Sequence, residues 1–131
     1  MGMKLHSTTI VVRDQDEALR FFVELLGWEK DEDAMMGPVM RFLTVKPVGA
    51  ETAIVLGQPE VYDRQPPGPD AGEGSSGISI LTDDIDATYA DLSAKGVTFT
   101  GPPQTMPWGD RATWFSDPSN NSFFIVEESQ S

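Results

Sequence analysis

The sequence predicts an α+β fold built from two tandem copies of one module, with a curved sheet whose outer face is covered by helices. The first observation is an internal repeat: residues 9–29 resemble residues 79–99 at an offset of 70, so that Ile10 matches Ile80. The second is that each copy has the same order of patterns, a short apolar strand, an amphipathic helix and then further strands. The inner face of such a sheet would be left open as a cup.

The first copy starts with a strand pattern and continues into a capped helix. Asp14, followed three residues later by Glu17, has the spacing of a capping box, and Gly27 suits the left-handed position that follows a helix. Two further strands are predicted at 39–47 and 51–58, where apolar residues recur. The predicted buried face of the helix consists of Ala18, Phe21, Phe22, Leu25 and Leu26.

The second copy repeats this order. Asp84 is expected to cap its helix and Gly96 to end it, and strands are predicted at 97–103, 111–117 and 122–128. The predicted buried face of this helix consists of Ile85, Thr88, Tyr89 and Leu92.

The two copies are separated by residues 58–77, which are dense in Pro, Gly and Asp. Such a composition predicts a linker or mobile loop rather than a core element. We therefore expect a single domain over residues 1–131, with a first module at about 3–58, a loop at 59–76 and a second module at about 77–128.

Composition limits the classes of function. The chain has 9 Lys and Arg against 21 Asp and Glu, a net charge of −12, which repels nucleic-acid phosphates and anionic lipid and attracts cationic small molecules. We therefore expect no nucleic-acid partner and no membrane partner. The alternative is that the acidic surface only keeps the protein soluble. The absence of cysteine excludes disulfides, thiolate metal sites and a cysteine nucleophile, and it leaves the redox compartment undetermined. The cytoplasm is the default expectation for the location.

Three stretches carry a resemblance to a known family: VVRDQDEALRFFVELLGW, TDDIDATYADLSAKGV and PWGDRATWFSDPSNNSFFIVEE. In this order they resemble the vicinal oxygen chelate superfamily, which includes glyoxalase I, extradiol dioxygenases, and the fosfomycin and bleomycin resistance proteins. The resemblance covers nearly the whole chain and implies two βαβββ modules, paired across a homodimer. The PWG and DP motifs are similar to those of the bleomycin-binding branch, which lacks a metal.

Metal-using members of this family take one ligand from each of four strands that line the cup. The resemblance transfers these positions to Ser7, Val55, Gly77 and Phe124. Because transition metals prefer imidazole, carboxylate or thiolate ligands, we expect no metal at these positions and no other cofactor. His6, the only histidine, and Glu127 lie one and three residues from two of these positions. Strand alternation turns both away from the cup, unless the register is slipped.

Alternation along the strands predicts the rest of the cup as an apolar hollow with scattered hydroxyl groups, typical of a small-molecule pocket. Ordinary sheet packing or a dimer interface is the alternative. Trp108 would border a ligand, as the resemblance implies, or else fill a loop; Arg111 would orient an anionic group or else pair with a surface acid. The predicted ligand-binding residues are Ser7, Thr9, Met40, Phe42, Val55, Gly77, Ser79, Trp108, Arg111 and Phe124.

Sequence and resemblance together predict a metal-independent protein that binds or sequesters a small aromatic or cationic molecule in the cup. The predicted cup lacks the carboxylate pair, the Ser–His pair or the lysine in an apolar setting that acid–base or covalent chemistry requires. Three alternatives remain: a metal-dependent lyase, isomerase or dioxygenase of the same superfamily, a metal-free enzyme, and a purely dimeric interaction module. Neither the ligand nor any catalytic residue follows from the sequence.

Overall fold

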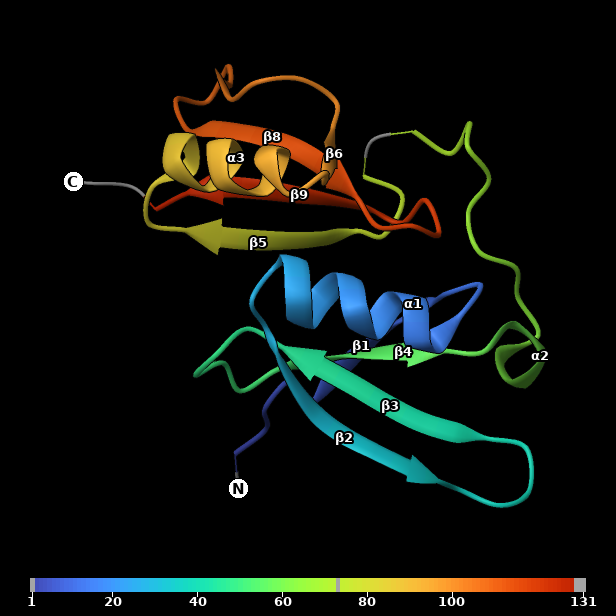
Figure 1. Ribbon diagram of the computed structural model, residues 1–131. Coiled ribbons are helices and arrows are strands. Elements are labelled where there is room, and N and C mark those ends of the chain that lie inside the picture. The colour runs from blue at the N-terminus through green and yellow to red at the C-terminus, as the bar shows by residue number, and fades with distance from the viewer. Residues whose placement is uncertain (1, 73, 129–131) are drawn as a thin grey trace. The chain divides into compact units, whose positions relative to one another are not determined.

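The computed structural model describes residues 2–72 and 74–128 of the chain. The chain divides into two compact units, which meet in sequence between Pro66 and Pro67, and each unit holds one β-sheet with a helix packed on it (Figure 1). Two sheets with few helices confirm the predicted α+β class. Within the described residues no helix is both long and apolar enough to cross a membrane.

The first unit has a four-stranded sheet in the order β1-β4-β3-β2. β1 runs parallel to β4, whereas β3 runs antiparallel to both β4 and β2. The helix α1 (Gln15–Arg20) continues directly into a π-helical turn, η1 (Phe21–Leu25), and covers one face of this sheet (Figure 1). The four strands are β1 (Ser7–Val11), β2 (Glu29–Met35), β3 (Arg41–Lys46) and β4 (Ala53–Gly57).

The second unit has a five-stranded sheet in the order β5-β9-β8-β6, and β7 also pairs with β8. β5 runs parallel to β9, and β8 runs antiparallel to β9, β6 and β7. The helix α3 (Ile85–Ala94) covers one face (Figure 1). The strands are β5 (Ile78–Thr82), β6 (Thr98–Phe99), β7 (Gln104–Thr105), β8 (Arg111–Ser116) and β9 (Ser122–Glu127).

The two sheets confirm the internal repeat residue by residue. In the first unit Thr9 of β1 pairs with Val55 of β4, and in the second unit Ser79 of β5 pairs with Phe124 of β9. Because Thr9 and Ser79 are 70 residues apart, Val55 and Phe124 occupy equivalent places in the two modules. This is the correspondence that the sequence predicted.

The helix ends also agree with the prediction. The carboxylates of Asp14 and Asp84 each accept a hydrogen bond from the backbone N–H three residues later, at 2.9 and 3.1 Å. Gly27 and Gly96 have φ angles of +77° and +96°, which residues with a Cβ rarely adopt. Local capping chemistry therefore fixes where both helices begin and end.

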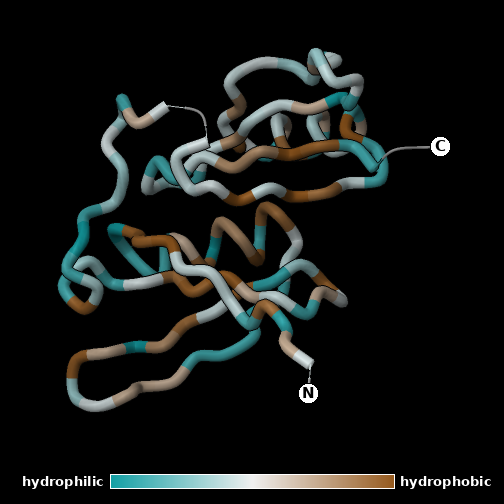
Figure 2. The backbone as a smooth tube through the Cα atoms, turned by 180° about the vertical axis from the view of Figure 1, so that it is seen from behind, coloured by the Kyte–Doolittle hydropathy of each residue, from teal (hydrophilic) through white to brown (hydrophobic). Residues whose placement is uncertain are grey.

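Each unit has its own apolar core between its sheet and its helix. Hydrophobic residues alternate with hydrophilic ones along several strands, as expected for strands with two different faces (Figure 2). In the second unit the rings of Phe115 and Phe123 stack with centroids 5.3 Å apart, and Phe99 links them to Tyr89 of α3. The largest fully buried apolar side chains are Val12, Phe22, Leu43, Val45 and Leu56 in the first unit and Ile85, Phe115 and Phe123 in the second.

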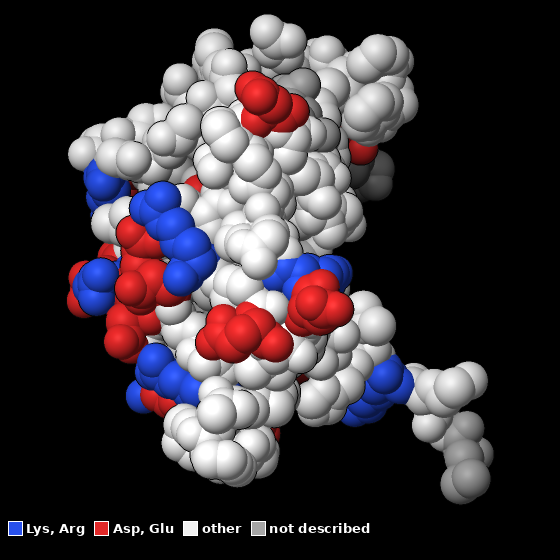
Figure 3. Space-filling model, turned by 90° about the vertical axis from the view of Figure 1, so that its right-hand side faces the viewer, with Lys and Arg blue, Asp and Glu red and all other residues white. Residues whose placement is uncertain are grey.

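The strand β2 was not predicted from the sequence. All seven of its residues are exposed, so its sequence EKDEDAM has no alternation of apolar and polar residues to reveal a strand. It lies at the edge of the sheet, where charges hinder pairing with another chain. Its acids pair with β3, as in the contacts of Arg41 with Asp33 and of Lys46 with Asp31. On the face drawn in Figure 3, acidic and basic side chains lie next to one another rather than in separate patches.

One other predicted strand boundary was wrong. The strand expected at 97–103 ends at Phe99, because the Gly101-Pro102-Pro103 sequence cannot continue a hydrogen-bonded ladder. The linker is not irregular throughout, since it begins with the short helix α2 (Pro59–Tyr62). The ring of Tyr62 lies so close to Gly57 that a Cβ there would stand 2.6 Å from it, so any other residue at this strand position would displace the ring.

The ion pair between Arg41 and Asp33 predicts a pH dependence of stability. The hydrogen bonds from Arg41 hold the pKa of Asp33 below its ordinary value of 3.8. A depressed pKa in the folded state stabilises the fold above the unfolded pKa, and this contribution disappears as the pH falls through the folded pKa. In urea unfolding from pH 7 to pH 2.5, the free energy of unfolding of Asp33→Asn should therefore fall less on acidification than that of wild type. Asp70→Asn, at an exposed loop position, should follow wild type, and parallel curves for all three proteins would contradict the prediction.

Candidate functional site

The second unit carries an aromatic surface on the sheet face that α3 does not cover. The register places Trp114 of β8 opposite Phe124 of β9, and the centroids of their rings are 4.9 Å apart. The neighbouring residues Phe115 and Phe123 point to the other face, toward α3, as strand alternation requires. Leu81 pairs with Val126 on the same side as Trp114 and is 62% exposed. This side of the sheet is therefore largely apolar and partly exposed.

Trp108 extends this surface from a tight turn. The N–H of Gly109 donates to the carbonyl of Met106 at 2.8 Å, and Pro107 occupies the second position of the turn, where its fixed φ is favourable. The indole Nε1 of Trp108 donates to Asp110 at 3.1 Å, which orients the ring. Its centroid lies 6.3 Å from that of Phe124, yet the side chain is 63% exposed. We call Trp108, Trp114 and Phe124 the aromatic face.

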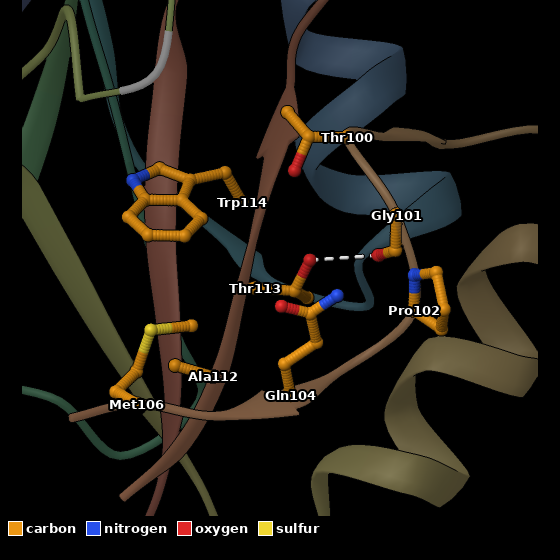
Figure 4. A pocket seen from close by; sticks show the side chains of 8 residues that line it. All are labelled: Thr100, Gly101, Pro102, Gln104, Met106, Ala112, Thr113 and Trp114. Carbon is orange, nitrogen blue, oxygen red and sulfur yellow. Dashed lines mark hydrogen bonds between the residues drawn. The ribbon is translucent and has the colours of Figure 1, made fainter.

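A hollow of about 160 Å³ adjoins the aromatic face at Trp114 (Figure 4). It forms because β6 and β7 both pair with β8, while the chain between them loops out at Gly101 and the two prolines. The hydroxyl of Thr113 donates to the carbonyl of Gly101 at 2.7 Å and holds this loop in place. The lining consists of Thr100, Gly101, Pro102, Gln104, Met106, Ala112, Thr113 and Trp114. Nothing in the local sequence pattern revealed this hollow.

In the first unit, the face of the sheet that α1 does not cover carries smaller and more polar side chains than the aromatic face of the second unit. Strand register places Thr9, Val55 and Thr44 side by side, and alternation adds Ser7 and Phe42 to the same face. Met40 lies just before β3, where its carbonyl accepts from the N–H of Met36 at 2.7 Å. The structure thus brings together four predicted residues of the first module: Ser7, Thr9, Phe42 and Val55.

A charged cluster on this face was missed by the sequence analysis. The Lys46 ammonium lies 3.4 Å from the Asp31 carboxylate, which also accepts from the hydroxyl of Thr44 at 3.2 Å. Lys46 and Thr44 are two residues apart in β3, so they share a face. The sequence showed no sign of this cluster because Asp31 lies in β2, the strand that the sequence analysis did not predict. All three groups are engaged with one another, which gives the cluster a structural role.

Four further residues do not form part of the aromatic face. Arg111 lies on the side of the sheet that α3 covers, where its Nη2 donates to Asp86 at 2.6 Å and to the carbonyl of Pro103 at 3.4 Å. The structure thus shows Arg111 paired with an acid, which was the alternative to a role in orienting a ligand. Glu127 accepts from the backbone N–H of Ile85 at 3.1 Å, at the start of α3. Gly77, with φ of +70°, closes a turn before β5, and exposed His6 contacts Ser7 at 3.1 Å.

The residues at the four metal-ligand positions do not fit a transition metal. Ser7 offers one hydroxyl, whereas Val55, Gly77 and Phe124 offer no side-chain donor. In residues 2–72 and 74–128 no group of three His, Asp or Glu side chains could hold an ion. We therefore derive no chemistry through a metal at these positions.

Comparisons with known proteins agree with the architecture. A family model described as Glyoxalase/Bleomycin resistance protein/Dioxygenase superfamily matches residues 4–125. A solved member of that superfamily from Sphaerobacter thermophilus is 53% identical, covering 97% of this chain and 98% of its own, with a TM-score of 0.88. The antibiotic-binding protein TnmS3 from Streptomyces sp. CB03234 is 33% identical, covering 98% of each chain, with a TM-score of 0.77. The uncharacterized protein YetH of Bacillus subtilis is 32% identical over 127 residues, 97% of this chain and 100% of its own.

Proposed function

The chain belongs to the glyoxalase/bleomycin resistance protein/dioxygenase superfamily, and on this basis we propose that it binds a planar aromatic small molecule, neutral or cationic, without a metal. The aromatic face is the observation that carries the proposal. Trp108 is held by a turn and by Asp110, yet most of its ring surface is exposed beside Phe124. A rigid, exposed indole offers a stacking surface whose conformational entropy is already lost before the ligand binds.

The net charge and the relatives support the chemical class of the ligand. Aromatic faces attract cations as well as planar rings, and a chain with a net charge of −12 favours a cation over an anion. TnmS3, which shares one third of its residues with this chain, is an antibiotic-binding protein. We propose the same kind of role here, sequestration of a small molecule rather than its chemical conversion. A homodimer and a cytoplasmic location are part of the proposal, and light scattering during gel filtration tests the former.

A fluorescence screen tests the proposal directly. In a Trp28→Phe background only Trp108 and Trp114 emit, because the chain has three tryptophans and Trp28 packs against Phe22 far along the sequence from both. Planar aromatic compounds of neutral and cationic type would be titrated in buffer with EDTA. At least one compound should quench the emission saturably with a Kd below 1 mM, an affinity of roughly 4 kcal/mol. No compound binding below the millimolar range would contradict the proposal.

The metal-dependent lyase, isomerase or dioxygenase remains the alternative function. It requires at least three donors, and the positions that would supply them hold Ser7, Val55, Gly77 and Phe124. We propose that protein purified without an affinity tag contains no stoichiometric metal, and that Ni²⁺, Zn²⁺, Mn²⁺, Fe²⁺ or EDTA leaves its Tm unchanged. About one ion per chain together with a shifted Tm would favour the alternative, because a ligand that binds the native state raises its stability.

A further inference from the structure

The geometry points to a more specific ligand: we infer that it carries a neutral hydrogen-bonding substituent, such as a carboxamide, which enters the hollow beside Trp114. The inference rests on the proposed function, since the hollow and the aromatic face share the Trp114 side chain. Ala112, which also lines the hollow, pairs with Val126 on the same side of the sheet as the aromatic face. A ring stacked at the aromatic face therefore has the hollow at its edge.

Two polar side chains in the hollow are free to bind such a group. The amide of Gln104 and the hydroxyl of Thr100 point into the space between Trp114 and Gly101 (Figure 4). In the part of the chain that the structure describes, neither side chain makes a hydrogen bond, whereas Thr113 in the same lining is satisfied by Gly101. Gln104 offers two N–H donors and one carbonyl acceptor, and Thr100 offers one donor and an acceptor. A carboxamide, which has both kinds of group, is complementary to this pair.

The hollow favours an uncharged substituent over an ion. None of its eight lining residues has an ionisable side chain. The nearest charged residues in sequence are already engaged: Arg111 pairs with Asp86, and Asp110 accepts from Trp108. An ion placed here would give up part of its hydration without gaining a counter-charge, whereas a neutral group gives up less.

The size of the hollow limits the substituent. A cavity of about 150 Å³ accommodates a benzene ring, so the hollow of about 160 Å³ has room for a group of about that bulk. A carboxamide, a small N-alkyl amide or a single heterocycle would fit. The planar core would lie beside it, on the aromatic face.

Three matched probes separate these contributions: naphthalene-2-carboxamide, 2-isopropylnaphthalene and 2-naphthoate, which share a planar core and differ in one substituent. Binding would be followed by the shifts of the indole N–H signals in NMR titrations of the full chain at 150 mM salt. The amide should bind about fivefold more tightly than the apolar isostere, the net effect of about one hydrogen bond. The carboxylate should bind more weakly than the amide.

Two variants assign this preference to the hollow. Gln104→Leu and Thr100→Val remove hydrogen-bonding groups at exposed positions. Each variant should reduce the preference for the amide over 2-isopropylnaphthalene to less than twofold. The affinity for 2-isopropylnaphthalene itself should not fall. Gln65→Leu, an exposed glutamine in the linker, is the matched control and should keep the preference. If all three probes bind wild type equally, or if Gln104→Leu retains the preference, the inference is wrong while the proposed function stands. If no probe shifts Trp108 or Trp114 while the fluorescence screen finds a ligand, the inference is wrong and the proposed function stands; if neither experiment detects binding, both are wrong.

Discussion

Replacing Trp108 with alanine is expected to weaken binding of the aromatic ligand by about 30-fold, or about 2 kcal/mol, the scale of a binding hot spot. The indole is 63% exposed and touches the rest of the protein through Phe124 and Asp110. Its removal therefore takes away a stacking surface without opening a cavity in the core. The free energy of unfolding should change by less than about 0.5 kcal/mol, as for most surface substitutions. Fluorescence or calorimetric titration measures the first quantity, and urea unfolding measures the second.

Three further variants locate the cause of this loss. Trp108→Phe retains a smaller ring and should recover part of the affinity. Asp110→Ala removes the acceptor of the indole N–H and leaves the Trp108 ring in place but less ordered. This variant should therefore weaken ligand binding less than Trp108→Ala does. Trp28→Phe, in the first unit, should have no effect. Unchanged affinity in Trp108→Ala would mean that this tryptophan only fills its loop, the alternative that the sequence left open.

The largest effect on stability is expected for Phe123→Ala. Phe123 is fully buried and stacks on Phe115, so truncation should cost about 3–5 kcal/mol. This is a large part of the total stability of a small domain, which is about 5–15 kcal/mol. Urea unfolding monitored by circular dichroism should show a clear shift of the midpoint. Where Phe123→Ala fails to fold, Phe123→Leu, with a smaller loss of volume, provides the measurement.

The adjacent Phe124→Ala variant is the matched control, since the two side chains leave β9 on opposite faces. Phe124 is half-buried and contacts Trp114 and Trp108, so its truncation should cost less than about 2 kcal/mol of stability but should weaken ligand binding strongly. If Phe124→Ala were as destabilising as Phe123→Ala, the aromatic face would be a packing surface rather than a binding surface. The pair thus separates the two interpretations of the open side of the sheet.

Much of the fold could be predicted from the sequence because its signals are local. The caps at Asp14 and Asp84 and the glycines at 27 and 96 depend only on neighbouring residues. The equivalence of Val55 and Phe124 could be predicted because the internal repeat supplies a second copy of the same register. The strand β2 could not be predicted, since an exposed acidic edge strand has no hydrophobic period.

The candidate site was predicted less completely, because it depends on pairing between distant segments. The side of the sheet on which Trp114 lies could not be derived from RATWFSD alone and follows only from its pairing with Phe124. The hollow arises where β6 and β7 pair with the same strand and the intervening prolines loop out. Gln104 and Thr100 therefore gave no signal in the sequence. Ligand binding by the predicted residues of the first unit, such as Thr9 and Phe42, stays a prediction. Separate variants at these residues would test it.

The most direct test of metal-independent aromatic binding is a ¹⁵N-indole NMR titration of the full chain with naphthalene-2-carboxamide, recorded once with EDTA and once with added Zn²⁺ or Ni²⁺. The chain has three tryptophans, each of which contributes one indole N–H signal. The proposed function predicts that the Trp108 and Trp114 signals shift saturably, that Trp28 does not, and that the Kd is the same with EDTA and with metal. A shift that requires metal, or one that moves Trp28 and leaves Trp108 and Trp114 in place, would contradict it.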